Sequence, residues 1–107
     1  MSKSLARVTE VLRLAGHPAV PLEMPGDTRT AVQAAAAAGC ELDQIVKSIL
    51  FQGVSGRLYL FLTAGGNQVD AARASALAGE PLGRADAAAV RAVTGFAIGG
   101  VAPIGHL

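Results

Sequence analysis

The centre of this chain is the stretch Ile45-Val46-Lys47-Ser48-Ile49-Leu50-Phe51, in which one charged residue interrupts an apolar run. Its length and composition predict a β-strand that places Lys47 on the same face as Ile49 and Phe51. Because both faces are mostly apolar, we expect this strand to be largely buried. Lysine is rarely buried without a partner, since removing an ammonium group from water is costly. Lys47 is therefore the first candidate functional residue.

Three explanations of Lys47 stay open at this point. Its ammonium group binds an anionic or strongly polar ligand, or it reaches solvent from an edge strand, or it pairs with a structural group. The structural partners to consider are backbone carbonyls, Asp43 and Asp70. The chain has only one other lysine, Lys3, near its N-terminus.

Size and composition narrow the class of protein. The chain of 107 residues has the size of one domain, residues 1–107, and its 51% of apolar residues is enough for a core. The net charge of +1 does not indicate a strong electrostatic binder of nucleic acid, and we expect no DNA partner. The single Cys40 excludes an intrachain disulfide and a cysteine-based zinc site, and it is typical of a cytoplasmic protein. Neither a signal-like N-terminus nor an apolar stretch of about 18 residues is present, so we expect no membrane segment.

Helical and strand patterns alternate along the rest of the chain. Apolar periodicity predicts helices over residues 4–15, 30–38, 71–78 and 87–93. Alternating or short apolar patterns predict strands over residues 19–23, 45–51, 57–63 and 96–98, with a hairpin connection at 53–56 and a turn at 25–27. This order is typical of an α+β fold in which a mixed β-sheet packs with helices.

Polar residues and glycines mark the ends of the expected helices. The candidate N-caps are Ser2 or Ser4, Thr28 or Thr30, Asp70 and Asp86, and the candidate stops are Gly16, Gly39 and Gly79. Asp43 is expected to open a single helical turn before the central strand. The five consecutive alanines at 34–38 suggest close packing of their helix against a neighbour.

A second candidate site is the glycine-rich stretch Gly99-Gly100-Val101-Ala102-Pro103-Ile104-Gly105-His106. Glycines let a ligand approach the main chain closely, and such a loop can direct backbone N–H groups at a carbonyl or phosphate oxygen. On composition alone, an ordinary tight turn between strands is the better explanation. His106 directly follows the loop and is included in the candidate site.

Other kinds of site are not indicated. The sequence has no phosphate-binding glycine motif, and His17 and His106 lie too far apart in sequence to suggest a metal site, so we expect neither metal nor cofactor. Cys40 has no evident base nearby and is expected to be a small core residue. No Ser-His-Asp arrangement is recognisable.

Taken together, these segments resemble the YbaK/EbsC family, which is related to the editing domain of bacterial prolyl-tRNA synthetases. The resemblance is carried by Thr28-x-Thr30 before an alanine helix, Gly39-Cys40, Ile45-Val46-Lys47-Ser48, Thr94-Gly95-Phe96 and the loop from Gly99 to Gly105. It covers nearly the whole chain. It implies the α+β fold of that editing domain and the activity of an aminoacyl-tRNA deacylase that acts in trans.

The resemblance also implies roles for individual residues. Lys47 is expected to engage the terminal nucleotide of the tRNA, and Gly99 and Gly100 are expected to contribute backbone contacts near the scissile ester. The remaining expected substrate contacts are Thr28, Thr30, Ser48, Val101, Ala102, Pro103, Gly105 and His106. No protein nucleophile is needed, because an aminoacyl ester is already activated and positioning can supply much of the acceleration.

Substrate, partners and completeness are expectations of the same kind. The acceptor end of aminoacyl-tRNA is the expected partner, with prolyl-tRNA synthetase as a second one, and small residues favour a small amino acid such as cysteine, alanine, serine or proline. The family domain normally continues beyond residue 107, so we expect its C-terminal part to be missing here, with a homodimer or low stability as the result. Two alternatives stay open: a non-catalytic module that binds tRNA or a synthetase, and a binding protein for a small anionic metabolite.

Overall fold

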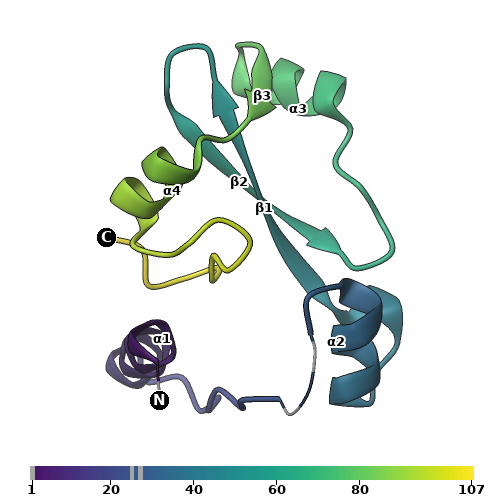
Figure 1. Ribbon diagram of the computed structural model, residues 1–107, viewed down its shortest axis with the longest axis vertical. Coiled ribbons are helices and arrows are strands. Elements are labelled where there is room, and N and C mark those ends of the chain that lie inside the picture. Colours follow the sequence, from purple (N-terminus) through teal and green to yellow (C-terminus); the bar gives the residue numbers. More distant parts are fainter. Residues whose placement is uncertain (1, 25, 27) are drawn as a thin grey trace. The chain divides into compact units, whose positions relative to one another are not determined.

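The computed structural model describes residues 2–24, 26 and 28–107. Its elements are, in chain order, α1 (Lys3–Leu14), α2 (Ala31–Ala38), the 3₁₀ turn η1 (Leu42–Gln44), β1 (Val46–Gly53), β2 (Leu58–Ala64), α3 (Ala71–Ala78), β3 (Leu82–Arg84) and α4 (Ala87–Thr94) (Figure 1). The predicted α+β class is confirmed. One detail needs correction: both strand pairings are antiparallel, so the described sheet is not mixed.

The chain divides into two compact units. One, the sheet unit, comprises Met24–Asp86, and the other, the terminal unit, comprises Met1–Glu23 together with Ala87–Leu107. Lys47 belongs to the sheet unit and the glycine-rich loop belongs to the terminal unit.

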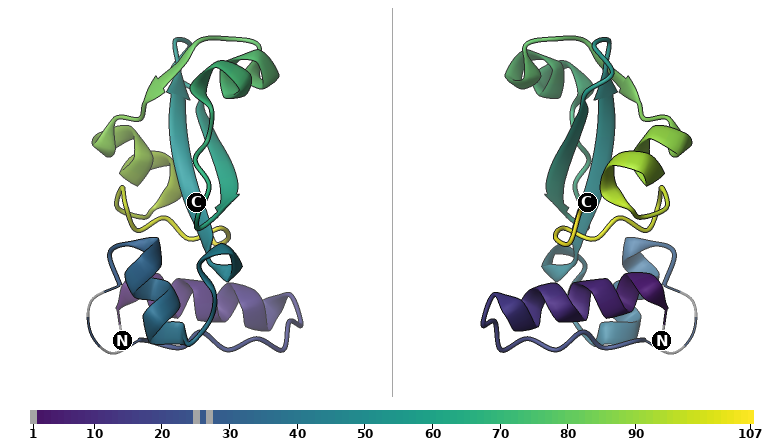
Figure 2. Two further views of the ribbon diagram at one scale, coloured as in Figure 1. Left: turned by 90° about the vertical axis from the view of Figure 1, so that its right-hand side faces the viewer. Right: turned by 90° about the vertical axis from the view of Figure 1, so that its left-hand side faces the viewer.

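The sheet unit is built on a long hairpin, with strand order β2-β1-β3. Lys47 pairs with Thr63, Ile49 with Phe61, and Phe51 with Tyr59, so these six side chains share one face. The amide of Gly53 donates to the carbonyl of Arg57 at 2.9 Å and closes the predicted turn. Helix α3 and β3 lie toward this turn, and α2 lies toward the other end of the hairpin (Figures 1 and 2).

The central strand is less buried than its composition predicts. Val46 is 63% exposed, and Leu62 of β2, which lies on the same face of the sheet, is 58% exposed. Only Gly53 is buried in β1, and Lys47 is half-buried. The physical reason is the size of the sheet: β3 pairs only with Phe51–Gly53, so most of β1 has one strand neighbour instead of two.

The helices of the sheet unit begin and end largely as their sequences predict. The Thr30 hydroxyl accepts from the amide of Gln33, whose side chain in turn accepts from the amide of Thr30, so Thr30 is the N-cap of α2. Gly39 ends α2 with φ 69°, which is a left-handed conformation that favours glycine. The expected close packing of the alanines is wrong for most of them, because Ala35 is buried whereas Ala36, Ala37 and Ala38 are exposed.

A carboxylate ties the hairpin turn to the connection between α3 and β3. Glu80 accepts hydrogen bonds from the Tyr59 hydroxyl at 2.6 Å, the Ser55 amide at 2.8 Å and the Ser55 hydroxyl at 2.9 Å. The bond from Tyr59, followed by those from Ser55, lowers the pKa of Glu80, and the same bond raises the pKa of Tyr59. Gly53 leaves room for this carboxylate, since a Cβ there would collide with it.

The terminal unit has its core around Val90, Thr94 and Phe96, which are almost fully buried. The Thr94 hydroxyl donates to the carbonyl of Val90 at 2.7 Å and accepts from the amide of Phe96 at 3.0 Å. Gly95 between them has φ 80°. This side chain therefore ends α4 and turns the chain so that Phe96 points inward, which explains the Thr94-Gly95-Phe96 sequence.

Three other expectations on secondary structure have different outcomes. Residues 19–23 and 96–98 form no strand. Pro21 lies within the former and Pro18 directly before it, and the latter are held in turns next to Thr94. The short β3 was not predicted, since three residues carry too little periodicity. The predicted turn at 25–27 lies partly outside the described residues.

Candidate functional site

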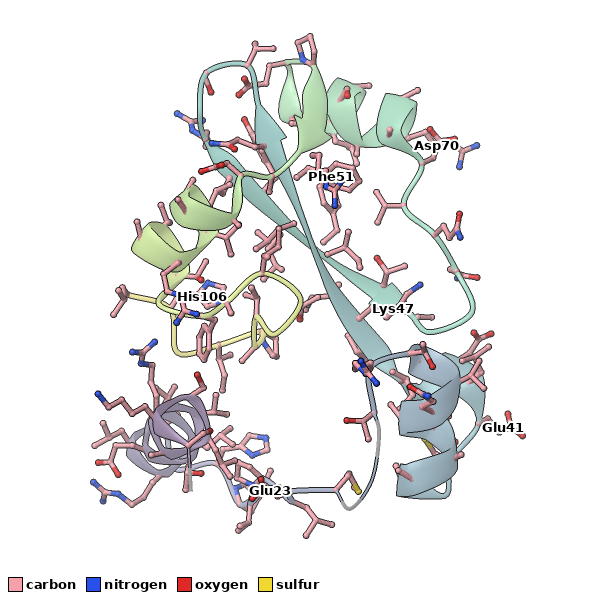
Figure 3. All side chains as sticks on the ribbon, viewed as in Figure 1. Glu23, Glu41, Lys47, Phe51, Asp70 and His106 are labelled. Carbon is pink, nitrogen blue, oxygen red and sulfur yellow. The ribbon has the colours of Figure 1, made fainter. Side chains whose placement is uncertain are left out.

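Lys47 is held by a backbone carbonyl of the sheet unit. Its side chain extends from β1 toward the loop that follows β2 (Figure 3), and Nζ donates a hydrogen bond to the carbonyl oxygen of Asn67. Neither Asp43 nor Asp70 forms an ion pair with it within the described chain. Of the explanations left open by the sequence, the backbone carbonyl is the one observed. An ammonium group has three donors, so this bond leaves two for a ligand.

The other predicted contacts in the sheet unit differ in what their side chains do. Ser48 follows Lys47 and lies on the opposite face of β1, paired with Leu62. The Thr30 hydroxyl is engaged in the cap of α2. Thr28 is exposed two residues before that cap. Strand β1 therefore places Lys47 and Ser48 on opposite faces. The N-cap of α2 gives Thr30 a structural role.

The predicted loop residues form one turn-rich segment after α4. Gly99 has φ 84°, and the amide of Gly100 donates to the carbonyl of Ala97 at 2.9 Å. The amides of Gly99 and Val101 make no hydrogen bond to the rest of the described chain. The amides of Gly99 and Val101 are therefore available to an oxygen of a ligand, as are those of Ala102, Ile104, Gly105 and His106, whereas the Gly100 amide is already used.

The side chain of His106 links the end of this loop to its middle and to the residues before it. His106 is labelled in Figure 3. Its Nε2 lies 2.6 Å from the carbonyl oxygen of Ala102, and its ring meets Phe96 edge-on with centroids 5.9 Å apart. Because a carbonyl oxygen only accepts, Nε2 carries the proton and donates. Val101, Ala102 and Gly105 are half-buried in the same segment, and Pro103 is exposed. The structure thus gives His106 a part in shaping the loop.

Sequence reasoning missed Arg7 of α1. Its guanidinium lies over the Phe96 ring, 5.1 Å from the centroid, and its Nη1 is buried without a hydrogen-bond partner among the described residues. A Cβ on Gly95 would collide with Nη1, and a Cβ on Gly105 would touch the Arg7 stem at 3.6 Å. Arg7 therefore packs against both ends of the segment from Gly95 to Gly105. An arginine in an amphipathic helix gives no signal of this in the sequence.

A depression of about 310 Å³ lies elsewhere in the sheet unit. It is lined by Gln52, Gly53, Val54, Pro81, Leu82, Gly83 and Arg84. It contains none of the residues that the sequence singled out as site residues. Among the described residues no group of histidine, cysteine or acidic side chains is arranged to hold a metal ion. Every helix described is too short or too polar to cross a bilayer.

Comparison with known proteins decides the family. A family model described as the aminoacyl-tRNA editing domain matches residues 25–107, which include both Lys47 and the glycine-rich loop. The chain belongs to the aminoacyl-tRNA editing domain family. This confirms the resemblance inferred from the sequence. A search of curated proteins finds no match.

Solved structures agree with membership of the editing-domain family. One, described as a proposed trans-editing enzyme for prolyl-tRNA synthetase, is 48% identical with a TM-score of 0.89 and is matched over 99% of this chain and 68% of its own. Another, from work on grafting epitope backbones onto scaffold proteins, is 46% identical with the same TM-score and coverage. A hypothetical protein is 31% identical with a TM-score of 0.83, over 94% of this chain and 67% of its own.

Proposed function

We propose that this chain is a trans-editing deacylase, which hydrolyses the ester between a wrong amino acid and the terminal adenosine of a tRNA. The observation that carries the proposal is the ammonium group of Lys47, which one backbone carbonyl orients on a strand of an editing-domain fold. Such a cation suits an anionic or polar group of a nucleotide. Membership of the editing-domain family supplies the substrate class.

Lys47 would bind the phosphate or ribose of the terminal nucleotide with the two donors that Asn67 leaves free. The amides of Gly99 and Val101 would polarise the ester carbonyl, on which negative charge grows in the transition state. A water molecule adds to the carbonyl carbon, the bond to the ribose oxygen breaks, and that oxygen leaves with a proton. No covalent acyl-enzyme is formed, since the substrate ester is already reactive.

We further infer that the substrate carries a small amino acid such as cysteine, alanine, serine or proline. The 48% identity to a proposed trans-editing enzyme for prolyl-tRNA synthetase supports a mischarged proline-specific tRNA, such as Cys-tRNA(Pro), as the substrate and that synthetase as a partner. Because the solved relatives match 94% to 99% of this chain and 67% to 68% of their own, we propose that residues 1–107 belong to one editing domain. The cytoplasm, where tRNA is charged, is the proposed location.

The decisive experiment is a deacylation panel of tRNAs mischarged with small amino acids. The variants are Lys47→Met, which keeps the apolar stem, Lys47→Arg, and Lys3→Met as the matched control on the chain's other lysine. We expect the turnover of Lys47→Met to be lower by about 10²-fold or more. This is the usual effect of removing one oriented group that stabilises the transition state. Lys47→Arg should lose most activity because a guanidinium cannot replace a compact ammonium.

The outcomes separate the proposal from its alternatives. Full activity of a folded Lys47→Met protein removes the role of Lys47. Binding of tRNA by the wild-type protein without turnover supports a non-catalytic module instead. Indifference to every tRNA in the panel supports a binding protein for a small anionic metabolite.

A further inference from the structure

The carbonyl that holds Lys47 belongs to a tight turn directly after β2, formed by residues 64–67. The amide of Asn67 donates to the carbonyl of Ala64 at 2.9 Å and closes the turn. The carbonyl of Asn67 then points its oxygen at the Nζ of Lys47. The direction of the ammonium group is therefore set by the position of this turn.

The turn is hydrogen-bonded to the residues directly before β1, which are η1 and its C-cap. The amide of Gly65 donates to the carbonyl of Ile45 at 2.8 Å. The amide of Gly66 donates to Oδ1 of Asp43, also at 2.8 Å. One backbone bond and one carboxylate bond thus hold the two residues immediately before Asn67. The carboxylate bond is the stronger kind, since its acceptor is charged.

Gly65 and Gly66 show how closely this turn packs against η1. A Cβ on Gly65 would collide with the carbonyl oxygen of Leu42, and a Cβ on Gly66 would collide with Oδ1 of Asp43. Neither glycine has a positive φ, so the contacts rather than the backbone conformation require them. The contacts between this turn and η1 therefore leave no room for a side chain at either glycine.

We propose that Asp43 is a positioning residue for Lys47. Its carboxylate fixes the amide of Gly66, the fixed turn presents the carbonyl of Asn67, and that carbonyl orients the ammonium group before substrate arrives. A lysine side chain has many rotamers, and orienting it in advance avoids the entropy that substrate binding would otherwise lose. This inference rests on the proposed function of Lys47, and it assigns Asp43 no contact with the substrate.

The test uses Asp43→Ala, Asp43→Asn and Asp70→Ala. Asp43→Asn keeps an acceptor oxygen for Gly66 and should rescue the wild-type behaviour. Asp70→Ala is the matched control, because Asp70 Oδ1 also accepts from one backbone amide, that of Arg73 at 3.0 Å, at the start of α3. Its loss removes an equivalent bond without touching the turn that holds Lys47.

Two readouts are measured on each protein. The first is the rate of reductive methylation of Lys47 by formaldehyde and a borane, followed by peptide mass spectrometry, with the exposed Lys3 as the internal reference. We expect Asp43→Ala to raise the ratio of Lys47 to Lys3 methylation several-fold. The second is the rate of deacylation. Asp43→Ala should lower kcat by about tenfold with a smaller change in KM, because the Lys47 ammonium would no longer be oriented for the transition state.

An unchanged methylation ratio or an unchanged kcat in Asp43→Ala overturns the inference, as does the same effect in Asp70→Ala. If Asp43→Ala does not fold, Gly66→Ala tests the same contact, because its methyl group displaces the Asp43 carboxylate while the backbone tolerates alanine. Failure of the proposed function is distinguishable: an active Lys47→Met protein removes the catalytic purpose, whereas the methylation ratio still reports whether Asp43 orients the lysine.

Discussion

At the scale of single residues, several side chains near the candidate sites serve the backbone. Thr30 caps α2, Thr94 ends α4, and His106 bonds the carbonyl of Ala102. Each hydroxyl or ring nitrogen satisfies a main-chain group that its loop or helix end would otherwise leave unpaired. The Lys47 ammonium and the amides of the glycine-rich loop other than that of Gly100 are still available to a ligand.

The loop amides can be tested at Gly100. An alanine there meets only the carbonyl oxygen of Ala97, at 3.6 Å, and needs no positive φ, so the fold should tolerate it. If substrate approaches this main chain closely, the methyl group should lower turnover by about 10²-fold. Gly83→Ala is the matched control, because its Cβ would also enter open space, on β3. Deacylation rates and melting temperatures of both variants decide the matter, and equal activity would exclude close approach at Gly100.

The proposal that no side chain of the protein acts as a nucleophile is tested at Cys40. The residue is half-buried, and its thiol makes no hydrogen bond to a base within the described chain. Cys40→Ser should therefore leave turnover nearly unchanged, and mass spectrometry of the enzyme mixed with substrate should detect no acyl adduct. An acyl-Cys40 adduct would instead make the protein a cysteine-nucleophile hydrolase.

At the scale of elements, the hairpin depends on polar contacts at its ends as much as on its apolar faces. The turn between β1 and β2 is tied to the α3–β3 connection through Glu80, and the turn after β2 is tied to η1 through Asp43. A hairpin alone is marginally stable in water, and β3 adds only three residues of pairing. The two carboxylates therefore compensate for a small sheet.

Glu80 makes stability depend on pH in the acid range. Its pKa in the folded protein lies below the ordinary 4.5, so its contribution is complete above that value and is lost as pH falls through the lowered pKa. We expect the melting temperature of the wild type to drop as the pH is lowered below about 4. The drop should be smaller in Glu80→Gln, whose side chain does not titrate. Parallel melting curves against pH for the two proteins would contradict this role.

At the scale of the whole molecule, the charges nearly cancel. Nine basic and eight acidic residues leave a net charge of +1, and the carboxylates of Asp43, Asp70 and Glu80 are engaged with backbone amides or hydroxyls. A chain of this kind has little long-range attraction for a tRNA body. On the proposed function, we expect recognition to depend on a few contacts at the acceptor end.

The dependence of tRNA affinity on salt should therefore be shallow. Each phosphate contact to a single strand contributes a slope of about −0.7 in log K against log salt concentration. With two contacts or fewer, affinity should fall less than about tenfold between roughly 50 and 200 mM salt. Fluorescence anisotropy with a labelled acceptor-stem RNA measures this slope. A loss of about 10³-fold would require an extended basic surface that the composition does not indicate.

Much of the local structure followed from the sequence. Ser2, Thr30 and Asp70 begin their helices as their hydroxyl or carboxylate chemistry predicts, and Gly39 and Gly79 end theirs. The turn between β1 and β2 and the alternation of β2 side chains between the two faces also followed from the sequence. These features depend on groups within about four residues of one another, so short-range chemistry is sufficient to specify them. The same holds for Lys47 as a candidate, because its conflict with an apolar strand is visible in seven residues.

Only the tertiary structure decided what these groups contact. The sequence could not distinguish Asp43, Asp70 or a carbonyl as the partner of Lys47, because Asn67 lies twenty residues away and binds through its backbone. It overstated the burial of β1 and of the alanines in α2, since burial depends on how many elements pack there. It missed Arg7 on Phe96 and Glu80 on Tyr59 for the same reason. Residue type determines which interactions are chemically available, whereas the packing of distant segments determines which of them are made.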